Sequence, residues 1–141
     1  MNNLEIIGLA LWWAEGSKSR RDKRWKNAVS YPIEITNTDH RIIKIFLKYM
    51  IQEMKIDPRR FKLQLQIHEG DDQAQLEKYW SEVTNIPKKR FNKTIVRPLG
   101  NKSGKSKGTC KVRFSDKMVY NSLQQQLNLL LESIPGCGAV G

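Results

Sequence analysis

Hydrophobic residues recur along this chain at two spacings, about 3.6 residues in some segments and two residues in others. The first long apolar run covers residues 3–15, contains no proline and is followed by Gly16. This pattern predicts a buried helix that ends at the glycine. A buried strand is the competing interpretation for so short a run, but the absence of valine and the glycine favour the helix.

Three further helices are predicted from apolar side chains at helical spacing. Their stripes run from Ile42 to Met54, from Leu76 to Val83 and from Val119 to Ile134, and the first helix ends before the Asp57–Pro58 pair. Each segment follows short polar side chains that can cap a helix: Thr38 or Asp39, then Asp71 and Asp72, and finally Ser115.

Strict alternation of apolar and polar residues predicts the strands. The segment FKLQLQIH (61–68) is the clearest case, and PIEITNT (32–38) and CKVRFS (110–115) follow the same rule. Further strands are expected around residues 25–31 and 93–97. One face of each alternating strand should be core, and the other should be wet or bound to a partner.

The predicted order is helix, two strands, helix, strand, helix, two strands, helix, which is an α+β fold. We expect a single domain over residues 1–134, because no internal linker divides it and 141 residues suit one core. Residues 135–141 contain few large side chains and are expected to form a flexible tail.

Charge narrows the class of partner. The formal net charge is +11 and the isoelectric point is near 9.8. Residues 83–115 contain no acidic side chain, and residues 18–26 form a second basic cluster. Such segments favour a polyanion, with nucleic acid the first candidate and an anionic membrane the second.

Other features exclude several classes of protein. Two cysteines cannot make a disulfide framework, and no Cys/His spacing suggests zinc. The apolar segment 4–14 is too short to span a bilayer, and no signal peptide is visible. We therefore expect a soluble, cytoplasmic protein with no membrane partner and no organic cofactor.

The polar strand faces, placed side by side, would form a surface of hydrogen-bond donors and acceptors. Arginine and lysine match guanine, glutamine matches adenine, and flanking cations neutralise phosphates. Solvated strand faces usually mix charges, whereas Glu34 is the only acid among these outward positions. The predicted DNA-binding residues are Arg20, Arg21, Lys23, Arg24, Lys26, Glu34, Thr36, Lys62, Gln64, Gln66, His68, Lys93, Arg97, Lys105, Lys107, Lys111 and Arg113.

The apolar segment 3–15 suggests how chemistry could be added to DNA binding. Ala10 and Ala14 share one helix face, and small residues at this spacing let two helices approach closely. Two such helices, one from each subunit, would place two copies of Glu15 together, where a divalent metal could bind. The alternative is that Glu15 only ends a core helix and pairs with Lys18 on the surface. His68 has a similar alternative: a general base or metal ligand, or a hydrogen-bonding surface residue.

The segment GLALWWAEG (8–16) resembles the nine-residue LAGLIDADG motif of homing endonucleases. The small residues, the acid at the eighth position and the final glycine match, and the order of predicted elements is similar to that fold over residues 4–134. The helix expected at 71–85 looks like an addition to the family core. The resemblance implies a LAGLIDADG homing-endonuclease-like fold with an antiparallel, saddle-shaped DNA-binding sheet. It also implies a site-specific endonuclease of double-stranded DNA.

One motif per chain implies a homodimer and a pseudo-palindromic DNA site. The resemblance further implies Mg²⁺ as cofactor, with Mn²⁺ as a substitute and Ca²⁺ supporting binding without cleavage. The implied roles are metal ligation by Glu15 and Gly16, catalysis by Glu15, Asn37 and Arg41, base contact by Glu34, and subunit contact by Gly8, Ala10, Leu11 and Ala14. For Asn37 and Arg41, the alternative is helix capping and a plain surface position.

This sequence also departs from the family pattern. Glu15 replaces the usual aspartate, Leu9 is bulky, and Trp12 and Trp13 are large for a packed pair of helices. No family lysine aligns, although Lys111 and Lys117 are candidates. Two rival functions on the same fold stay open: a DNA-binding regulator that does not cut, and an RNA-binding intron splicing factor.

Overall fold

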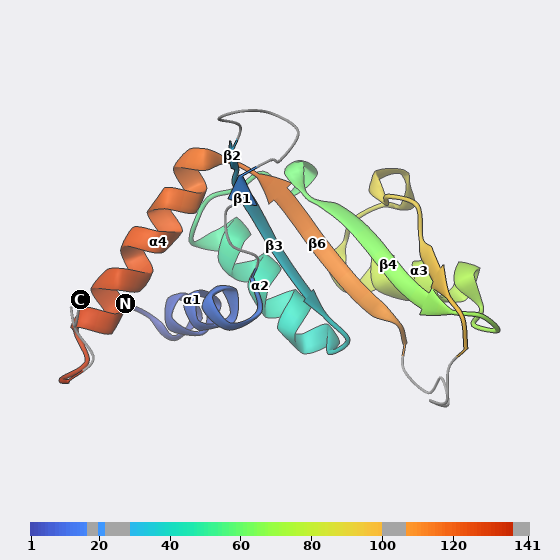
Figure 1. Cartoon of the computed structure of the whole chain (residues 1–141), viewed down its shortest axis with the longest axis horizontal. Helices are drawn as coiled ribbons and strands as arrows, with labels where there is room; N and C mark the ends of the chain where they lie inside the picture. Colours follow the sequence, from blue (N-terminus) through green and yellow to red (C-terminus); the bar gives the residue numbers. More distant parts are fainter. Residues whose placement is uncertain (17–19, 22–28, 100–106, 137–141) are drawn as a thin grey trace.

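Four helices and a four-stranded mixed sheet form an α+β fold in the part of the chain that the structure describes. This computed structural model describes residues 1–16, 20–21, 29–99 and 107–136 (Figure 1). The elements are α1 (Asn3–Glu15), β1 (Arg20–Arg21), β2 (Val29–Ser30), β3 (Pro32–Asn37), α2 (His40–Gln52), η1 (Pro58–Arg60), β4 (Lys62–His68), α3 (Gln73–Thr84), η2 (Lys88–Arg90), β5 (Ile95–Arg97), β6 (Thr109–Ser115) and α4 (Lys117–Glu132).

The predicted order of the four helices and of the strands from residue 32 onward is confirmed, whereas β1 was not predicted. The predicted helix at 3–15 has those bounds in the structure. The strand expected around 25–31 is described only at β2, and residues 22–28 lie outside the described part. The tail at 135–141 stays a prediction, because residues 137–141 also lie outside it.

The main sheet has the strand order β3-β6-β4-β5. Strand β6 runs antiparallel to both β3 and β4, but β5 runs parallel to β4. The expectation of a wholly antiparallel sheet was therefore wrong at its edge. Between β4 and β5 the chain passes through α3 and η2, and this crossover returns it in the same direction. Strands β1 and β2 form a separate antiparallel pair.

One face of the sheet supports the core. The buried side chains on this face are Ile33, Ile35, Leu63, Leu65, Ile67, Cys110, Val112 and Phe114. Helix α2 lies behind the sheet in Figure 1, α3 lies behind β4, and α1 packs beside β3 against α2 and α4. The opposite face turns toward the viewer in Figure 1 and is called the open face here.

Helix α1 is held in the core by aromatic neighbours. The ring of Trp12 is fully buried and meets Tyr120 of α4 edge-on, with ring centroids 5.6 Å apart. At its start, the Asn2 side chain accepts the Glu5 N–H, and Glu5 accepts the N–H of Asn2. This capping box begins the helix at the residue that the apolar pattern predicted.

Aspartates cap the three other helices. Asp39 caps α2 and Asp72 caps α3, as the sequence allowed. The expected cap of α4 was wrong by one residue, since Asp116 rather than Ser115 accepts the Val119 N–H at 3.0 Å. Ser115 is still in β6, where it pairs with Pro32. Among the described residues, no helix is both long and apolar enough to cross a membrane.

Candidate nucleic-acid interface

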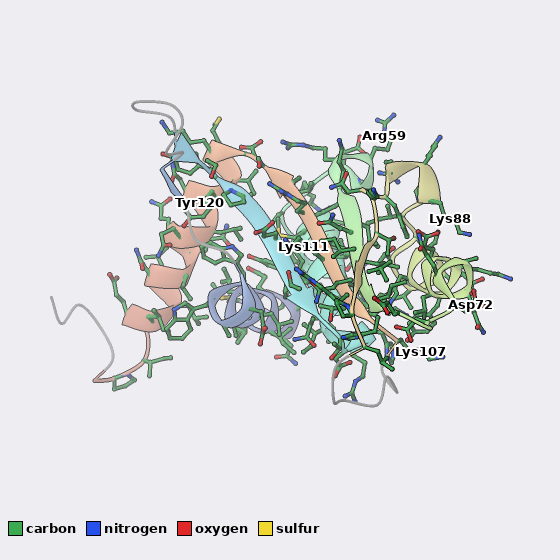
Figure 2. The ribbon with its side chains drawn as sticks, turned by 45° about the vertical axis from the view of Figure 1, so that its right-hand side comes forward. Arg59, Asp72, Lys88, Lys107, Lys111 and Tyr120 are labelled. Carbon is green, nitrogen blue, oxygen red and sulfur yellow. The ribbon has the colours of Figure 1, made fainter. Side chains whose placement is uncertain are left out.

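The open face carries its polar side chains in rows, because the register of the strands aligns every second residue. The rows hold Glu34, Arg113 and Lys62; then Thr36, Lys111 and Gln64; then Thr109, Gln66 and Ile95; and last His68 and Arg97. Figure 2 shows Lys111 over the middle of the sheet and Lys107 at one end of it. The strand residues predicted from alternation are therefore brought together on one surface.

Glu34 is on this surface, but the structure gives it a buried position. Only 5% of the residue is exposed, and its Oε2 lies 3.5 Å from Nε of Arg113 on the neighbouring strand. The expectation that Glu34 presents an exposed carboxylate to bases is corrected. The strand register places it on the open face, but the residue is buried there and paired with Arg113. Arg113 in turn has part of its charge balanced within the protein.

A hollow of about 440 Å³ lies at one end of the open face. Its lining residues are Arg60, Lys62, Asn92, Arg113, Phe114 and Ser115. The Arg60 guanidinium lies 4.9 Å from the Phe114 ring centroid and 3.0 Å from a carboxylate oxygen of Asp116. Three cations and an amide donor in one concavity suit a phosphate oxygen.

Sequence reasoning missed Arg60 and Asn92 as parts of this surface. Arg60 lies in η1, before β4 begins, so the alternation of the strand gave no signal for it. Asn92 offered no signal either, because it lies in an irregular segment. Its main-chain N–H donates to the Leu63 carbonyl, with 2.7 Å between nitrogen and oxygen.

A smaller hollow, of about 50 Å³, lies nearer the middle of the open face. Its lining residues are Thr36, Gln64, Leu65, Gln66, Ile95, Thr109 and Lys111. The Gln64 amide donates to the Lys93 carbonyl at 2.9 Å, which orients that side chain. Ile95 is the apolar member of a polar row, and sequence reasoning missed this residue too.

Helix α1 exposes an apolar face. Ile6 and Ile7 are 41% and 42% exposed, Trp13 is 51% exposed, and Ala10 and Ala14 are exposed between them. These positions recur at helical spacing and so lie on one side of the helix. Glu15 is exposed at the C-terminal end of the same helix.

Two residues expected at the subunit interface lie elsewhere. Gly8 is buried, and a Cβ placed on it would lie 2.5 Å from Cδ2 and 2.7 Å from Cβ of Tyr49 on α2. Leu11 is half-buried and packs against the core. The small size of Gly8 is therefore explained by close packing of α1 on α2 within the chain, and only Ala10 and Ala14 of the predicted set are on the exposed face.

Gly16 sets the position of Glu15 relative to the sheet. Its N–H donates to the Trp12 carbonyl at 2.9 Å, and it forms an antiparallel bridge with Ile35 of β3. A Cβ at Gly16 would meet the Trp12 carbonyl oxygen and would lie 2.8 Å from Cδ1 of the Trp12 ring. The missing side chain thus lets the main chain pass close to Trp12 at the end of α1, where Gly16 forms its bridge with β3.

Asn37 and Arg41 meet through Asp39. The Asn37 side chain accepts the Asp39 N–H at 2.9 Å. Asp39 accepts the Arg41 main-chain N–H at 2.9 Å and pairs with its guanidinium at 2.8 Å. This side-chain bond is the main cause that lowers the pKa of Asp39 to about 2. Asn37 therefore supports the cap residue Asp39 and does not itself cap α2. The Arg41 side chain is 75% exposed, and the catalytic roles of both residues stay predictions.

The remaining predicted basic residues are only partly described. Lys93, Arg97 and Lys107 are exposed, and the Lys107 carbonyl accepts the Trp80 indole N–H at 2.8 Å, which ties the start of β6 to α3. Arg20 and Arg21 form β1, although their side chains are not described. Lys18, the possible partner of Glu15, lies outside the described residues, as do Lys23, Arg24, Lys26 and Lys105.

Metal ligands are sparse within one chain. No group of three or more His, Cys, Asp or Glu side chains that could hold a metal occurs among the described residues. His68 has a buried Nδ1 without a hydrogen-bond partner there, and its main-chain N–H donates to Asp71 at 2.9 Å. Glu15 and the Gly16 carbonyl would give two oxygen donors per chain, so a complete cation site would need a second chain.

Comparison with known proteins adds no family assignment. The chain matches no family model, no curated protein and no solved structure.

Proposed function

We propose that this protein is a site-specific endonuclease of double-stranded DNA of the LAGLIDADG type, which acts as a homodimer on a pseudo-palindromic site. One observation carries the proposal: the exposed apolar face of α1 ends in Glu15 at the place where that helix meets β3. The motif GLALWWAEG and the order of the elements support it. The fold assignment to this family is part of the proposal.

The α1 face supports pairing of two chains. Ile6, Ile7 and Trp13 are large apolar side chains that are about half exposed in the single chain. Contiguous exposed apolar side chains mark contact surfaces, and Ala10 and Ala14 let a second helix approach closely. A twofold axis along this face makes the contact self-complementary and brings the two copies of Glu15 near each other.

The open face supports binding of the duplex. Lys62, Lys93 and Arg97 are exposed on or beside it, and Lys111 and Arg113 are half-buried in the same rows. Glu34 is the only acid in those rows and is held by Arg113. Cations bind phosphates without regard to sequence, and amides and guanidinium groups between them contact base edges.

The donor set at the end of α1 fits a hard cation. Glu15 and the Gly16 carbonyl of each of two chains supply oxygen atoms only, which Mg²⁺ prefers and Mn²⁺ accepts. The cation supplies Lewis-acid stabilisation of the charge that develops at a phosphate. Glu15 would hold the cation, the Gly16 carbonyl would supply a second oxygen donor beside β3, and the cations of the open face would keep the phosphates close.

Cleavage of a plasmid library in Mg²⁺ tests the proposal, with Glu15→Gln as the test variant. Glu82→Gln is the matched control, because Glu82 is an exposed glutamate on α3, which lies behind the sheet (Figure 1). We expect defined cuts from the wild type and from Glu82→Gln and none from Glu15→Gln, and binding without cutting in Ca²⁺. Sequence-specific binding without cutting in Mg²⁺ or Mn²⁺ would contradict the endonuclease and support a DNA-binding regulator. Preference for structured intron RNA over duplex DNA would point to splicing.

A further inference from the structure

The small hollow of the open face joins an apolar side chain to two amides. Strands β4 and β5 run parallel with Gln66 opposite Ile95, so both side chains point to the open side. Both line the hollow, whose other lining residues are Thr36, Gln64, Leu65, Thr109 and Lys111. An isoleucine there is not explained by the core, which lies on the other side of the sheet.

The two glutamines differ in what they can still bind. The Gln64 amide nitrogen donates to the Lys93 carbonyl, so one donor of this lining residue is already used within the protein. Within the described residues, no hydrogen bond uses the Gln66 side chain. Gln66 therefore keeps both a donor and an acceptor for a ligand, next to the aliphatic surface of Ile95.

This combination matches one kind of base pair. In the major groove, adenine presents N7 as an acceptor and its amino group as a donor, and a glutamine amide binds both. Thymine presents a methyl group, the one apolar feature of a base edge in that groove. Guanine and cytosine offer no methyl group to Ile95.

We propose that this hollow recognises A·T base pairs, with Gln66 on the adenine edge and Ile95 on the thymine methyl. The inference depends on the proposed binding of duplex DNA and adds its base preference. In a symmetric dimer, each half-site then contains at least one A·T pair whose thymine methyl is needed for full affinity.

Replacement of single thymines by uracil tests this directly, because uracil lacks only the methyl group. Duplexes selected from a random library by the wild-type protein would be resynthesised with one uracil at a time. We expect about fourfold weaker binding at one thymine in each half-site and no change at the others, which corresponds to loss of one buried methyl contact.

Two variants locate the contact. Ile95→Ala should bind the thymine and uracil duplexes equally. Val96→Ala is the matched control, since Val96 is the next residue of β5, is 48% exposed and pairs with Ile67 on the opposite side. This control should retain the fourfold difference. Circular dichroism confirms that each variant is folded, and the wild-type comparison stands without either.

The outcomes separate this inference from the proposed function. If specific duplexes are selected but uracil is neutral at every thymine, or if Ile95→Ala keeps the difference, the reading of A·T pairs is overturned while DNA binding stands. If no duplex sequence is enriched at all, the proposed function fails and this inference fails with it.

Discussion

Replacement of Gly8 by alanine tests how α1 packs within the chain. The added Cβ would lie 2.5 Å from Cδ2 and 2.7 Å from Cβ of Tyr49. Favourable carbon–carbon contacts lie at about 3.5 Å, so the two helices would have to separate or the ring would have to move. Tyr49 is fully buried, and the close packing of protein interiors opposes movement of its ring.

Two opposing effects decide the magnitude. Overpacking of a buried position costs about 1–3 kcal/mol, and overlap with several atoms of a buried ring places Gly8→Ala at the upper end. Alanine in a helix is more favourable than glycine by about 1 kcal/mol. The net loss of stability should be about 2 kcal/mol, which lowers the Tm by about 6 °C for a chain of this size.

Thermal and urea unfolding of four proteins would measure this: the wild type, Gly8→Ala, Tyr49→Ala and the double variant. Tyr49→Ala removes the ring but keeps the Cβ that would lie 2.7 Å from the added one. Gly8→Ala should therefore cost less in that background, and the two substitutions should couple by about 1 kcal/mol or more. Ala10→Gly, on the exposed face of α1, should cost only the propensity difference of about 1 kcal/mol. The packing argument is refuted if Gly8→Ala is at least as stable as the wild type when Tyr49 is present.

Three other outcomes are expected. Trp13→Asp should leave the chain folded but weaken self-association about a hundredfold or more, because an exposed aromatic side chain is lost from a symmetric contact. Light scattering would measure the association, and an unchanged dimer would contradict this prediction. Lys62→Ala and Arg97→Ala should each lower the salt dependence of duplex binding, by about 0.9 per copy in the slope of log K against log salt; an unchanged slope would remove that side chain from the phosphate contacts. The pKa of Asp39 is lowered to about 2, mainly by its bond to Arg41, so its stabilisation is present above about pH 4 and is lost as pH falls toward 2. Asp39→Asn should reduce that acid loss in thermal unfolding, and an acid loss equal to that of the wild type would exclude the pair as its cause.

Sequence patterns predicted the elements best where burial and period coincide. Alternation over 61–68 places Leu63 and Leu65 in the core, as expected, and the apolar run 3–15 is a helix with those bounds. The patterns failed where tertiary contacts decide. The residues of β5 alone do not indicate that it pairs in parallel with β4, because its direction depends on the crossover through α3.

The candidate site was predicted only in part, for similar reasons. The alternating strands indicated the open face, but the hollow at its end depends on Arg60 and Asn92, which come from segments outside the strands. The sequence alone does not show whether a glycine in an apolar helix contacts a second subunit or its own chain. Gly8 is expected at the subunit interface, but in the structure it packs against Tyr49 of the same chain.

The central claim is that two copies of α1 pair through their exposed faces and bring both Glu15 side chains together. A short thiol-specific cross-linker applied to Glu15→Cys, in a chain that also carries Cys137→Ser, tests it most directly. Glu82→Cys in the same background is the control, and Cys110 is buried in both proteins. The account predicts efficient covalent dimers from Glu15→Cys on DNA and few from Glu82→Cys. Only monomers from Glu15→Cys, or equal yields from the two variants, would contradict it.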